Sequence, residues 1–398
     1  MPRKSPFYSR TSQLCESQSW VDWSGYLSAN MYELDHSHEY NAVRTSCGLF
    51  DVSPLYKYTV RGSQALALLN RIVTRDLTKC RVGQVVYTTW CNDDGKVIDD
   101  GTVARLSDDY FRMTAAVPTL YWLQDNSFGL DVEIEDVSEA YGGLALQGPT
   151  SRDVLQNLTD ADLEGLKYFQ IIEDKVAGVP AQISRTGYTG DLGYEIFVAP
   201  DGAEELWDAV VDTGRAYALL PAGNTALDMV RIEAGLLLID ADFVSTNQTL
   251  FEVQRSSPYE LGLDWTVKLN KDYFVGQDAL RAEKASGPAW RTVGLEIDVE
   301  ALEKVYRKFA MPLHLPYTSW TEAVPVYRDE GARQYIGKAT SGTWSPILKK
   351  YVVIARIKPQ DAAVGSRIFM EATVESQRFA VPATVVKLPF FDPPRKRQ

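Results

Sequence analysis

Cysteine and histidine are scarce in this chain, which has four and three of them among 398 residues. The cysteines, at positions 15, 47, 80 and 91, have no CxxC spacing, and the histidines at 36, 38 and 314 complete no tetrahedral zinc set with them. This pattern argues against a zinc centre and against a disulfide-rich secreted scaffold. We therefore expect no metal site, reduced thiols and a cytoplasmic location.

Long apolar runs and an excess of positive charge are also missing. No stretch of about eighteen apolar residues occurs, and the N-terminal segment lacks the apolar core of a secretory signal. Acidic residues outnumber basic ones by 53 to 41, so the formal net charge is −12. We expect no nucleic-acid or membrane partner, although a local basic pocket is compatible with this charge. We interpret the basic C-terminal run "PPRKRQ" as a solvated tail.

The common catalytic and nucleotide-binding motifs are absent as well. The sequence contains no GxSxG, no P-loop, no HExxH and no GxGxxG after its "GLALQGP" segment. Acidic and aromatic side chains are therefore the candidates for chemistry. The length of the chain favours two or three domains.

Hydrophobic spacing predicts a chain of mixed α and β structure. Residues 57–140 alternate strands with helices and include two strands around the turn "NDDG". An apolar stripe runs along residues 202–217, and a second helix follows with Asn224 or Thr225 as its candidate cap. Beyond residue 290, short strands separated by Gly, Pro and Asp turns predict an antiparallel barrel or sandwich, with a boundary near "EKASGPAW".

One acidic cluster lies in the segment "NDDGKVIDDG". Asp93 and Asp94 fall in the turn, where local hydrogen bonds to the backbone explain them. Asp99 and Asp100 fall in the returning strand, where acidic residues are uncommon. Adjacent strand residues point to opposite faces, so we expect one of this pair to point to solvent and the other inward. The inward acid is a candidate functional group.

A second cluster is the loop "SRTGYTGDLGYEIFV", residues 184–198. Its glycines allow a close approach of the backbone to a flat ligand, or positive φ angles, and its tyrosines offer stacking faces. Glu195 presents two parallel acceptors, which complement a heterocycle edge with two neighbouring N–H donors, such as the N3–H and 2-amino group of a pterin. The alternative is a glycine-rich hairpin with an exposed acid.

Seven segments, taken together and in order, resemble the glycine cleavage T-protein family of tetrahydrofolate-dependent one-carbon transferases, which includes folate-dependent demethylases. The segments are "HEYNAVRTSCGLFDVS", "VVYTTWCNDDGKVIDD", "ALQGPTSRDVL", "SRTGYTGDLGYEIFV", "VRIEAGLLL", "GLDWTVKLNKDYFVGQDAL" and "IGKATSGTWSP". The resemblance implies an α+β fold: a three-domain cloverleaf around a central folate channel, with a C-terminal antiparallel β-barrel domain. The expected domains are residues 1–56 with 141–289, which bind folate, residues 57–140, which carry the catalytic acid, and residues 290–398, the barrel.

The resemblance also implies a site and a cofactor, tetrahydrofolate. By its place in the motif, Asp100 matches the family's catalytic aspartate, close to the reactive nitrogens of folate. Tyr87 matches a folate-contacting tyrosine, and Tyr188 and Glu195 match the residues that hold the pterin. Trp265 matches a tryptophan near the channel, although a core tryptophan is equally compatible with the sequence.

The departures from the family pattern cluster where the one-carbon donor would sit. Leu227 occupies the position of an arginine in the family's "ARD" triplet, and an aliphatic side chain cannot replace the hydrogen bonds of a guanidinium. Val117 replaces an asparagine, and "DWSGY" and "DVSPL" replace "FAGW" and "DVSHM". A donor pocket could draw on aromatic residues that are equally compatible with a core position: Trp20, Trp23, Tyr26, Tyr32, Tyr121 and Trp122.

These features predict an enzyme that moves a methyl group from a small O-, S- or N-methylated donor to N5 of tetrahydrofolate. One alternative is the aminomethyltransferase of the glycine cleavage system, whose partner would be a lipoylated carrier protein. Another is a folate-binding protein without catalysis. The retained Asp100 argues against the second alternative, and Leu227 and Val117 argue against the first.

Overall fold

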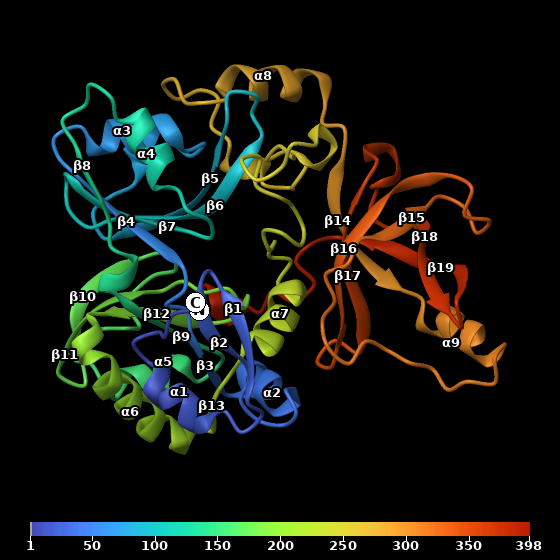
Figure 1. The fold of residues 1–398 in the computed structure, drawn as a ribbon, viewed down its shortest axis with the longest axis horizontal. Helices are drawn as coiled ribbons and strands as arrows, with labels where there is room; N and C mark the ends of the chain where they lie inside the picture. The colour runs from blue at the N-terminus through green and yellow to red at the C-terminus, as the bar shows by residue number, and fades with distance from the viewer. Residues whose placement is uncertain (1) are drawn as a thin grey trace.

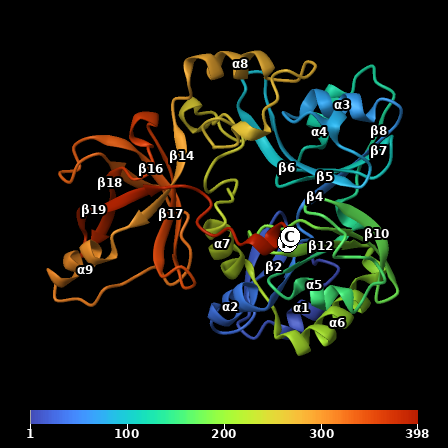
Figure 2. The ribbon, with the colours of Figure 1, turned by 180° about the vertical axis from the view of Figure 1, so that it is seen from behind.

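A computed structural model describes residues 2–398 and consists of three lobes, each built around its own β-sheet (Figure 1). The same three lobes are visible from behind (Figure 2). Within residues 2–398, no helix combines the length and the apolar character needed to cross a membrane. The four cysteines are free and buried.

The first lobe contains a six-stranded sheet in the order β10-β11-β12-β9-β3-β13, antiparallel except where β13 pairs with β3. Its strands are β3 (Cys47–Asp51), β9 (Gly142–Gln147), β10 (Ile171–Val176), β11 (Val179–Ser184), β12 (Gly193–Val198) and β13 (Leu219–Pro221). The surrounding elements are α1 (Tyr8–Leu14), the hairpin β1 (Ser19–Trp23) and β2 (Tyr26–Met31), α2 (Ser37–Thr45), α5 (Ser151–Gln156), α6 (Ala203–Gly214) and α7 (Asn224–Glu233). The apolar stripe predicted for α6 is confirmed, because Leu206, Trp207 and Val210 are buried in the core of this lobe.

The start of α7 differs from the prediction. Gly223 is the N-cap, and its N–H donates to Glu39 Oε2 at 2.7 Å. The side chains of Asn224 and Thr225 instead bond to Ser28 and Asn30 of β2. A glutamate distant in the sequence satisfies the helix end, so a local cap is not needed.

The second lobe contains a five-stranded antiparallel sheet in the order β5-β6-β7-β4-β8. Its elements are β4 (Tyr56–Arg61), α3 (Ala65–Ile72), β5 (Gln84–Cys91), β6 (Val97–Arg105), β7 (Tyr110–Ala115), α4 (Leu120–Asn126) and β8 (Glu133–Asp136). One face of the sheet packs Tyr58, Val60, Phe111 and Met113 against the two helices. Because side chains alternate along a strand, the other face presents a different set of residues, which lies toward the first lobe.

Residues 246–275 cover the turn end of β5 and β6. Main-chain bonds join Thr246 N to Val97 O at 2.9 Å, Val97 N to Ser256 O at 2.8 Å and Val275 N to Arg71 O at 2.9 Å. The segment continues into α8 (Gln277–Ser286), which lies beside the same strands (Figure 1). These bonds favour grouping the segment with the second lobe, whereas the expected division placed it with the first.

The third lobe is a closed six-stranded antiparallel barrel in the order β14-β17-β16-β15-β18-β19, so the predicted C-terminal barrel is confirmed. Its elements are β14 (Arg291–Ile297), α9 (Val299–Arg307), β15 (Val324–Tyr327), β16 (Tyr335–Ser345), β17 (Lys350–Ile357), β18 (Arg367–Val374) and β19 (Gln377–Val386). Strand β17 is buried on both faces. Val353 and Ala355 fill the barrel, while Val352 and Ile354 pack against the segment after α7, and this fixes the barrel beside the first lobe.

Buried ion pairs join the lobes at α7. Glu233 accepts bonds from Arg44 Nε at 2.7 Å and from Ser345 Oγ of the barrel at 2.6 Å. Arg231 donates to Asp242 at 2.5 Å and to Ser341 of the barrel at 2.8 Å. Breaking one partner of such a pair leaves an uncompensated buried charge, so these contacts constrain the angle between the lobes.

The basic C-terminal run is not a solvated tail, and that interpretation is wrong. Arg395 donates two bonds to Asp191, at 2.7 and 2.8 Å, and Phe391 N donates to Glu233 O at 2.8 Å. Both ribbon views place the C-terminus beside β12 of the first lobe (Figures 1 and 2). A buried carboxylate attracts the guanidinium, which a reading of local charge could not foresee.

Candidate active site

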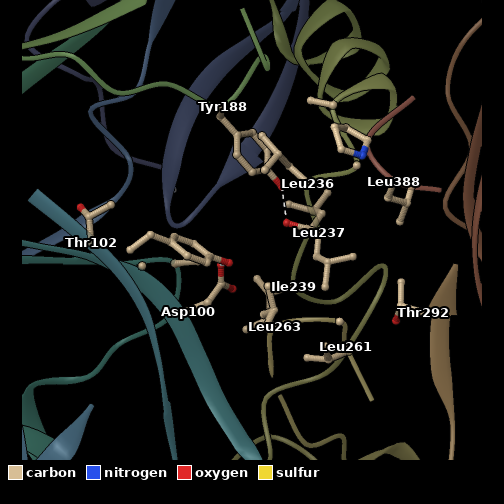
Figure 3. Close-up of a pocket in the computed structure, with 18 of the residues that line it drawn as sticks. Asp100, Thr102, Tyr188, Leu236, Leu237, Ile239, Leu261, Leu263, Thr292 and Leu388 are labelled. Atoms are coloured by element: carbon tan, nitrogen blue, oxygen red, sulfur yellow. Dashed lines mark hydrogen bonds between the residues drawn. The ribbon is translucent and has the colours of Figure 1, made fainter. Parts of the chain in front are cut away.

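A cavity of about 1460 Å³ lies where the three lobes meet. The first lobe contributes Trp23, Tyr188 and Glu195, and the second contributes Asp100 and Thr102. The barrel side contributes Thr292, and Leu237, Ile239, Leu261 and Leu263 lie between these two sides (Figure 3). The volume exceeds the roughly 300–1000 Å³ of ordinary small-ligand pockets.

The glycines of the 184–198 loop are explained mainly by packing against Gln147 of β9. A Cβ at Gly187 would lie 2.0 Å from the Gln147 side chain, and one at Gly193 would lie 2.3 Å from it. Gln147 in turn donates to Thr186 O at 3.1 Å and accepts from Thr189 Oγ1 at 2.8 Å. Only Gly190 of the three uses a positive φ, +72°. The buried glutamine thus holds the loop in the shape that lines the cavity.

Glu195 lines the cavity from β12, and one of its two carboxylate oxygens accepts a hydrogen bond within the protein. Its Oε2 accepts a hydrogen bond from Thr186, whereas Oε1 accepts none within residues 2–398. Burial raises the pKa of the Glu195 carboxyl, and the hydrogen bond from Thr186 and the charges of Arg112 and Lys57 oppose this rise. The carboxylate is therefore a desolvated acceptor whose second oxygen is available to a ligand.

Lys57 and Arg112, which the sequence reading missed, lie on the face of the second sheet that is turned toward Glu195. Lys57 is fully buried, and its Nζ donates to the carbonyls of Ser53 and Leu55 at 2.9 and 2.7 Å. Burial and the nearby Arg112 lower the pKa of Lys57 to about 7. The sequence held one signal for this pair: Lys57 and Arg112 interrupt strands that otherwise show apolar alternation. A basic side chain buried at such a position needs an anionic or carbonyl partner.

The guanidinium of Arg112 lies 4.0 Å from the centre of the Phe197 ring and donates to Gln182. Burial lowers the pKa of Arg112 to about 10. Phe197 itself lines the cavity two residues after Glu195. The Arg112 guanidinium is thus held in place by β12, the strand that also carries Glu195.

Asp99 and Asp100 point to opposite faces of β6, as expected from strand alternation, but neither faces bulk solvent. Asp99 is fully buried and accepts from the N–H groups of Ala116 and Val117 at 2.8 and 2.9 Å. It therefore supports the β7–α4 connection. Asp100 lines the cavity and is the inward-facing candidate. Burial raises its pKa to about 6, and the hydrogen bond from Tyr87 opposes this rise.

Tyr87 and Trp265 form one unit beside Asp100. The Tyr87 hydroxyl donates to Asp100 Oδ2, and its ring stacks on that of Trp265 with centroids 5.7 Å apart and planes 19° apart. Trp265 is 47% exposed and lines the cavity, so it is not a core residue. Tyr188 lies across the cavity and donates to the carbonyl of Leu237, which fixes the segment after α7 (Figure 3).

Of the six aromatic candidates for a donor pocket, Trp23 alone lies on the cavity wall. Tyr26 and Tyr32 are buried elsewhere, and Tyr121 is 79% exposed on the surface. Trp20 and Trp122 pack against the cores of the first and second lobes. The aromatic pocket expected from sequence is therefore reduced to one tryptophan.

Trp23 belongs to an apolar wall that also includes Phe50, Val52, Leu55 and Leu227, all of which line the cavity and pack in one cluster. We call this surface the donor wall. Val117 also lines the cavity, near Asp100, and is 7% exposed. The two departures noted from sequence, Leu227 and Val117, thus both face the cavity.

The comparisons with known proteins agree with this geometry. Residues 12–271 match the family model described as the GCVT N-terminal domain, and residues 313–392 match the glycine cleavage T-protein C-terminal barrel domain. A crystal structure of the glycine cleavage system aminomethyltransferase T from Bartonella henselae superimposes with a TM-score of 0.82 and 22% identity, covering 98% of this chain and 99% of that one. The fold is therefore that of a T-protein.

Two curated relatives show the family at the level of sequence. An aminomethyltransferase of Thermoanaerobacter sp. (strain X514) is 36% identical over 353 residues, which is 87% of this chain and 88% of the relative. A trimethylamine-oxide aldolase of Ruegeria pomeroyi is 34% identical over 413 aligned positions that cover 100% of this chain but 48% of the relative. The chain belongs to the glycine cleavage T-protein family. Members of this family are one-carbon transferases that use tetrahydrofolate, and this chain is an enzyme of that class.

The residues of the cavity fit tetrahydrofolate. Glu195 is half-buried and offers an unpaired carboxylate oxygen to the donors of a pterin edge. Tyr188 lines the same cavity, whose wall includes residues of β12 and of the barrel strand β14. Among residues 2–398 no group of three or more His, Cys, Asp and Glu side chains could hold a metal ion.

Proposed function

We propose that the protein transfers a methyl group from a small O-, S- or N-methylated donor to N5 of tetrahydrofolate. The observation that carries this proposal is the donor wall. Leu227 and Val117 face the cavity together with Trp23, beside a carboxylate at Asp100. An apolar wall of this kind suits methyl groups and offers no guanidinium to a polar aminomethyl donor.

Tetrahydrofolate, when bound, supplies the amine nitrogen that accepts the one-carbon group. Glu195 would hold the pterin through its free oxygen, with Tyr188 beside it. Asp100 would stabilise the positive charge that develops at the amine and accept its proton, and Tyr87 would keep the carboxylate in place. Trp23 would bind the methylated end of the donor through its ring face. Most of the acceleration would come from holding the two reactants in line.

The relative from Ruegeria pomeroyi is named for trimethylamine oxide, an N-methylated compound, and this supports an N-methylated donor; this chain matches 48% of that relative. A second candidate is aminomethyl transfer, the activity for which the Thermoanaerobacter relative is named. Its donor would be carried by a lipoylated protein partner. The overall identity to that relative favours this candidate, and the residues at positions 227 and 117 argue against it.

A label-transfer assay tests the proposal. The purified protein is incubated with tetrahydrofolate and, in turn, with deuterated-methyl forms of trimethylamine oxide, a quaternary ammonium compound, a sulfonium compound and an aryl methyl ether. We expect labelled 5-methyltetrahydrofolate from at least one of them, detected by mass spectrometry. Label recovered instead as 5,10-methylenetetrahydrofolate would contradict methyl transfer.

A parallel assay with an aminomethyl-loaded lipoyl carrier measures ammonia release that depends on tetrahydrofolate. Rapid release there, without label transfer from any methylated compound, would replace the proposal with the second candidate. Binding of tetrahydrofolate with no turnover in either assay would favour a binding protein without catalysis.

A further inference from the structure

Arg112 of β7 is a buried cation that the fold leaves poorly paired. Its side chain is 3% exposed, and its guanidinium donates to Gln182. Within residues 2–398 the guanidinium forms no ion pair, and its Nε–H has no hydrogen-bond partner. Burying a cation without a carboxylate costs free energy that an apolar side chain in the same place avoids. The charge at this position therefore needs an explanation beyond packing.

Strand alternation places Arg112 on the face of the second sheet that is turned toward the first lobe. Its neighbours in β7, Phe111 and Met113, point instead to the helices of the second lobe. Across the lobe boundary, the guanidinium lies 4.0 Å from the centre of the Phe197 ring. Phe197 of β12 is paired with Gln182 of β11, the residue that accepts the hydrogen bond from Arg112. Both contacts therefore hold the guanidinium over one place on the first sheet.

Glu195 lies on the same face of β12 as Phe197. One residue separates the two, so their Cα atoms are roughly 7 Å apart and their side chains point the same way. Both side chains also line the cavity. The guanidinium that covers Phe197 is therefore close enough to act on the Glu195 carboxylate, and a charge acts more strongly through a protein interior than through water.

The other titratable groups that face Glu195 are few. Lys57 is one of them, and its Nζ is already held by two main-chain carbonyls. Tyr168 is another, and burial raises its pKa to about 12, so it stays neutral at ordinary pH. The groups that face Arg112 besides Glu195 and Lys57 are Tyr110, Tyr141 and the exposed Glu173.

We infer that Arg112 is a positioning residue that keeps the Glu195 carboxylate ionised, so that its free oxygen remains an acceptor for the pterin edge. This inference rests on the proposed function, because it takes the pterin to bind at Glu195. Burial favours the neutral form of the acid, and a fixed positive charge favours the ionised form. A protonated carboxyl would present its own O–H donor to the N–H donors of the pterin.

The test is the dissociation constant of tetrahydrofolate, measured by titration calorimetry from about pH 5 to pH 8 for the native protein and for Arg112→Met. Affinity falls as the pH drops through the pKa of Glu195, because the protonated acid no longer accepts. Loss of the guanidinium raises this pKa, so the fall should occur roughly one pH unit higher, and acidic binding should be up to about tenfold weaker. At pH 8 the two proteins should agree within about twofold.

Two further variants separate charge from shape and place. Arg112→Lys keeps the positive charge and should keep the native profile. Arg61→Met removes a guanidinium that stacks on the Tyr110 ring at 3.9 Å in the same lobe, but Arg61 is exposed and does not line the cavity, so the profile should stay native. The series is repeated with Asp100→Asn as background, because Asp100, with a pKa of about 6, also titrates in this range. Thermal denaturation checks that each variant is folded.

Three results would overturn the inference: coinciding profiles for Arg112→Met and the native protein, an equal loss of affinity at every pH, or an Arg112→Lys variant that behaves like Arg112→Met. An equal loss at every pH would mark a purely structural residue. If the native protein binds tetrahydrofolate and transfers a methyl group while the profiles coincide, the positioning role alone fails. If the native protein binds no tetrahydrofolate at any pH, the proposed function fails with it.

Discussion

The Tyr87 hydroxyl donates to Asp100 Oδ2 while its ring stacks on Trp265. One side chain therefore both lowers the pKa of the Asp100 carboxyl and forms part of the cavity wall beside it. Tyr87 and Asp100 come from adjacent strands, where Tyr87 pairs with Thr102 and Thr89 pairs with Asp100. The hairpin β5–β6 therefore delivers the acid and its hydrogen-bond donor to the cavity as a single rigid unit.

Removing this hydrogen bond should move the pH dependence of the reaction. Burial raises the pKa of Asp100 to about 6, and Tyr87 lowers it, so Tyr87→Phe should raise it further. In the proposed mechanism the ionised carboxylate accepts the proton, so activity should be lost as pH falls through this pKa. The acidic limb of the rate profile should move up by roughly one to two pH units. Tyr121→Phe, on the surface of the same lobe, is the control; an identical profile for Tyr87→Phe would contradict the role of this bond.

Asp100→Asn should remove activity without weakening the fold. Asparagine keeps an acceptor for Tyr87 but cannot take up a proton, so turnover should fall by roughly 10²–10⁴-fold, while tetrahydrofolate still binds. Because the pKa of Asp100 in the folded chain is about 6, above its ordinary value, the ionised acid destabilises the native state above that pH.

The stability of this variant gives an independent check. Asp100→Asn should gain about 2 kcal/mol in the free energy of unfolding at pH 8 and little at about pH 3, below the pKa of the acid in both the folded and the unfolded chain. Thermal denaturation at the two pH values measures the difference. Full activity of the variant would end the catalytic assignment.

Glu195→Gln should weaken tetrahydrofolate binding by about 1–3 kcal/mol, because an amide presents one acceptor where the carboxylate presents two. Glu164→Gln, an exposed change in the same lobe, should have no effect. Titration calorimetry compares the two variants. Unchanged affinity in Glu195→Gln would show that the pterin lies elsewhere in the cavity.

The fold was predictable where local pattern decides it. The hairpin around "NDDG", the stripe of α6 and the C-terminal barrel follow from alternation and turn residues, and the structure has all three. The cap of α7 and the docking of Arg395 on Asp191 were not predictable, because their partners are distant in the sequence. Contacts of that kind are set by how the lobes assemble.

The residues of the candidate site also divide into those that the sequence predicted and those that it did not. Motif resemblance selected Tyr87, Asp100, Tyr188, Glu195 and Trp265, and all five line one cavity, although their roles stay predictions. Lys57 and Arg112 escaped notice because a basic residue in a strand is ordinarily solvated, and its burial depends on a neighbouring lobe. The same limit applies to the aromatic residues, since composition cannot tell a cavity wall from a core.

Leu227 should be the residue that fixes the class of donor. It is half-buried on the donor wall, packed with Trp23 and Leu55. Leu227→Arg would place a guanidinium against this apolar surface, where it occupies the space of the donor's methyl groups and repels a cationic donor. The kcat/KM for the methylated donor should fall by roughly 10–100-fold, a loss of about 1.4–2.7 kcal/mol, while the affinity for tetrahydrofolate stays within about twofold, which also shows that the variant is folded. Leu227→Met preserves the apolar surface and should keep most of the activity. If Leu227→Arg turned over the methylated donor as well as Leu227→Met does, the donor would have to bind away from this wall.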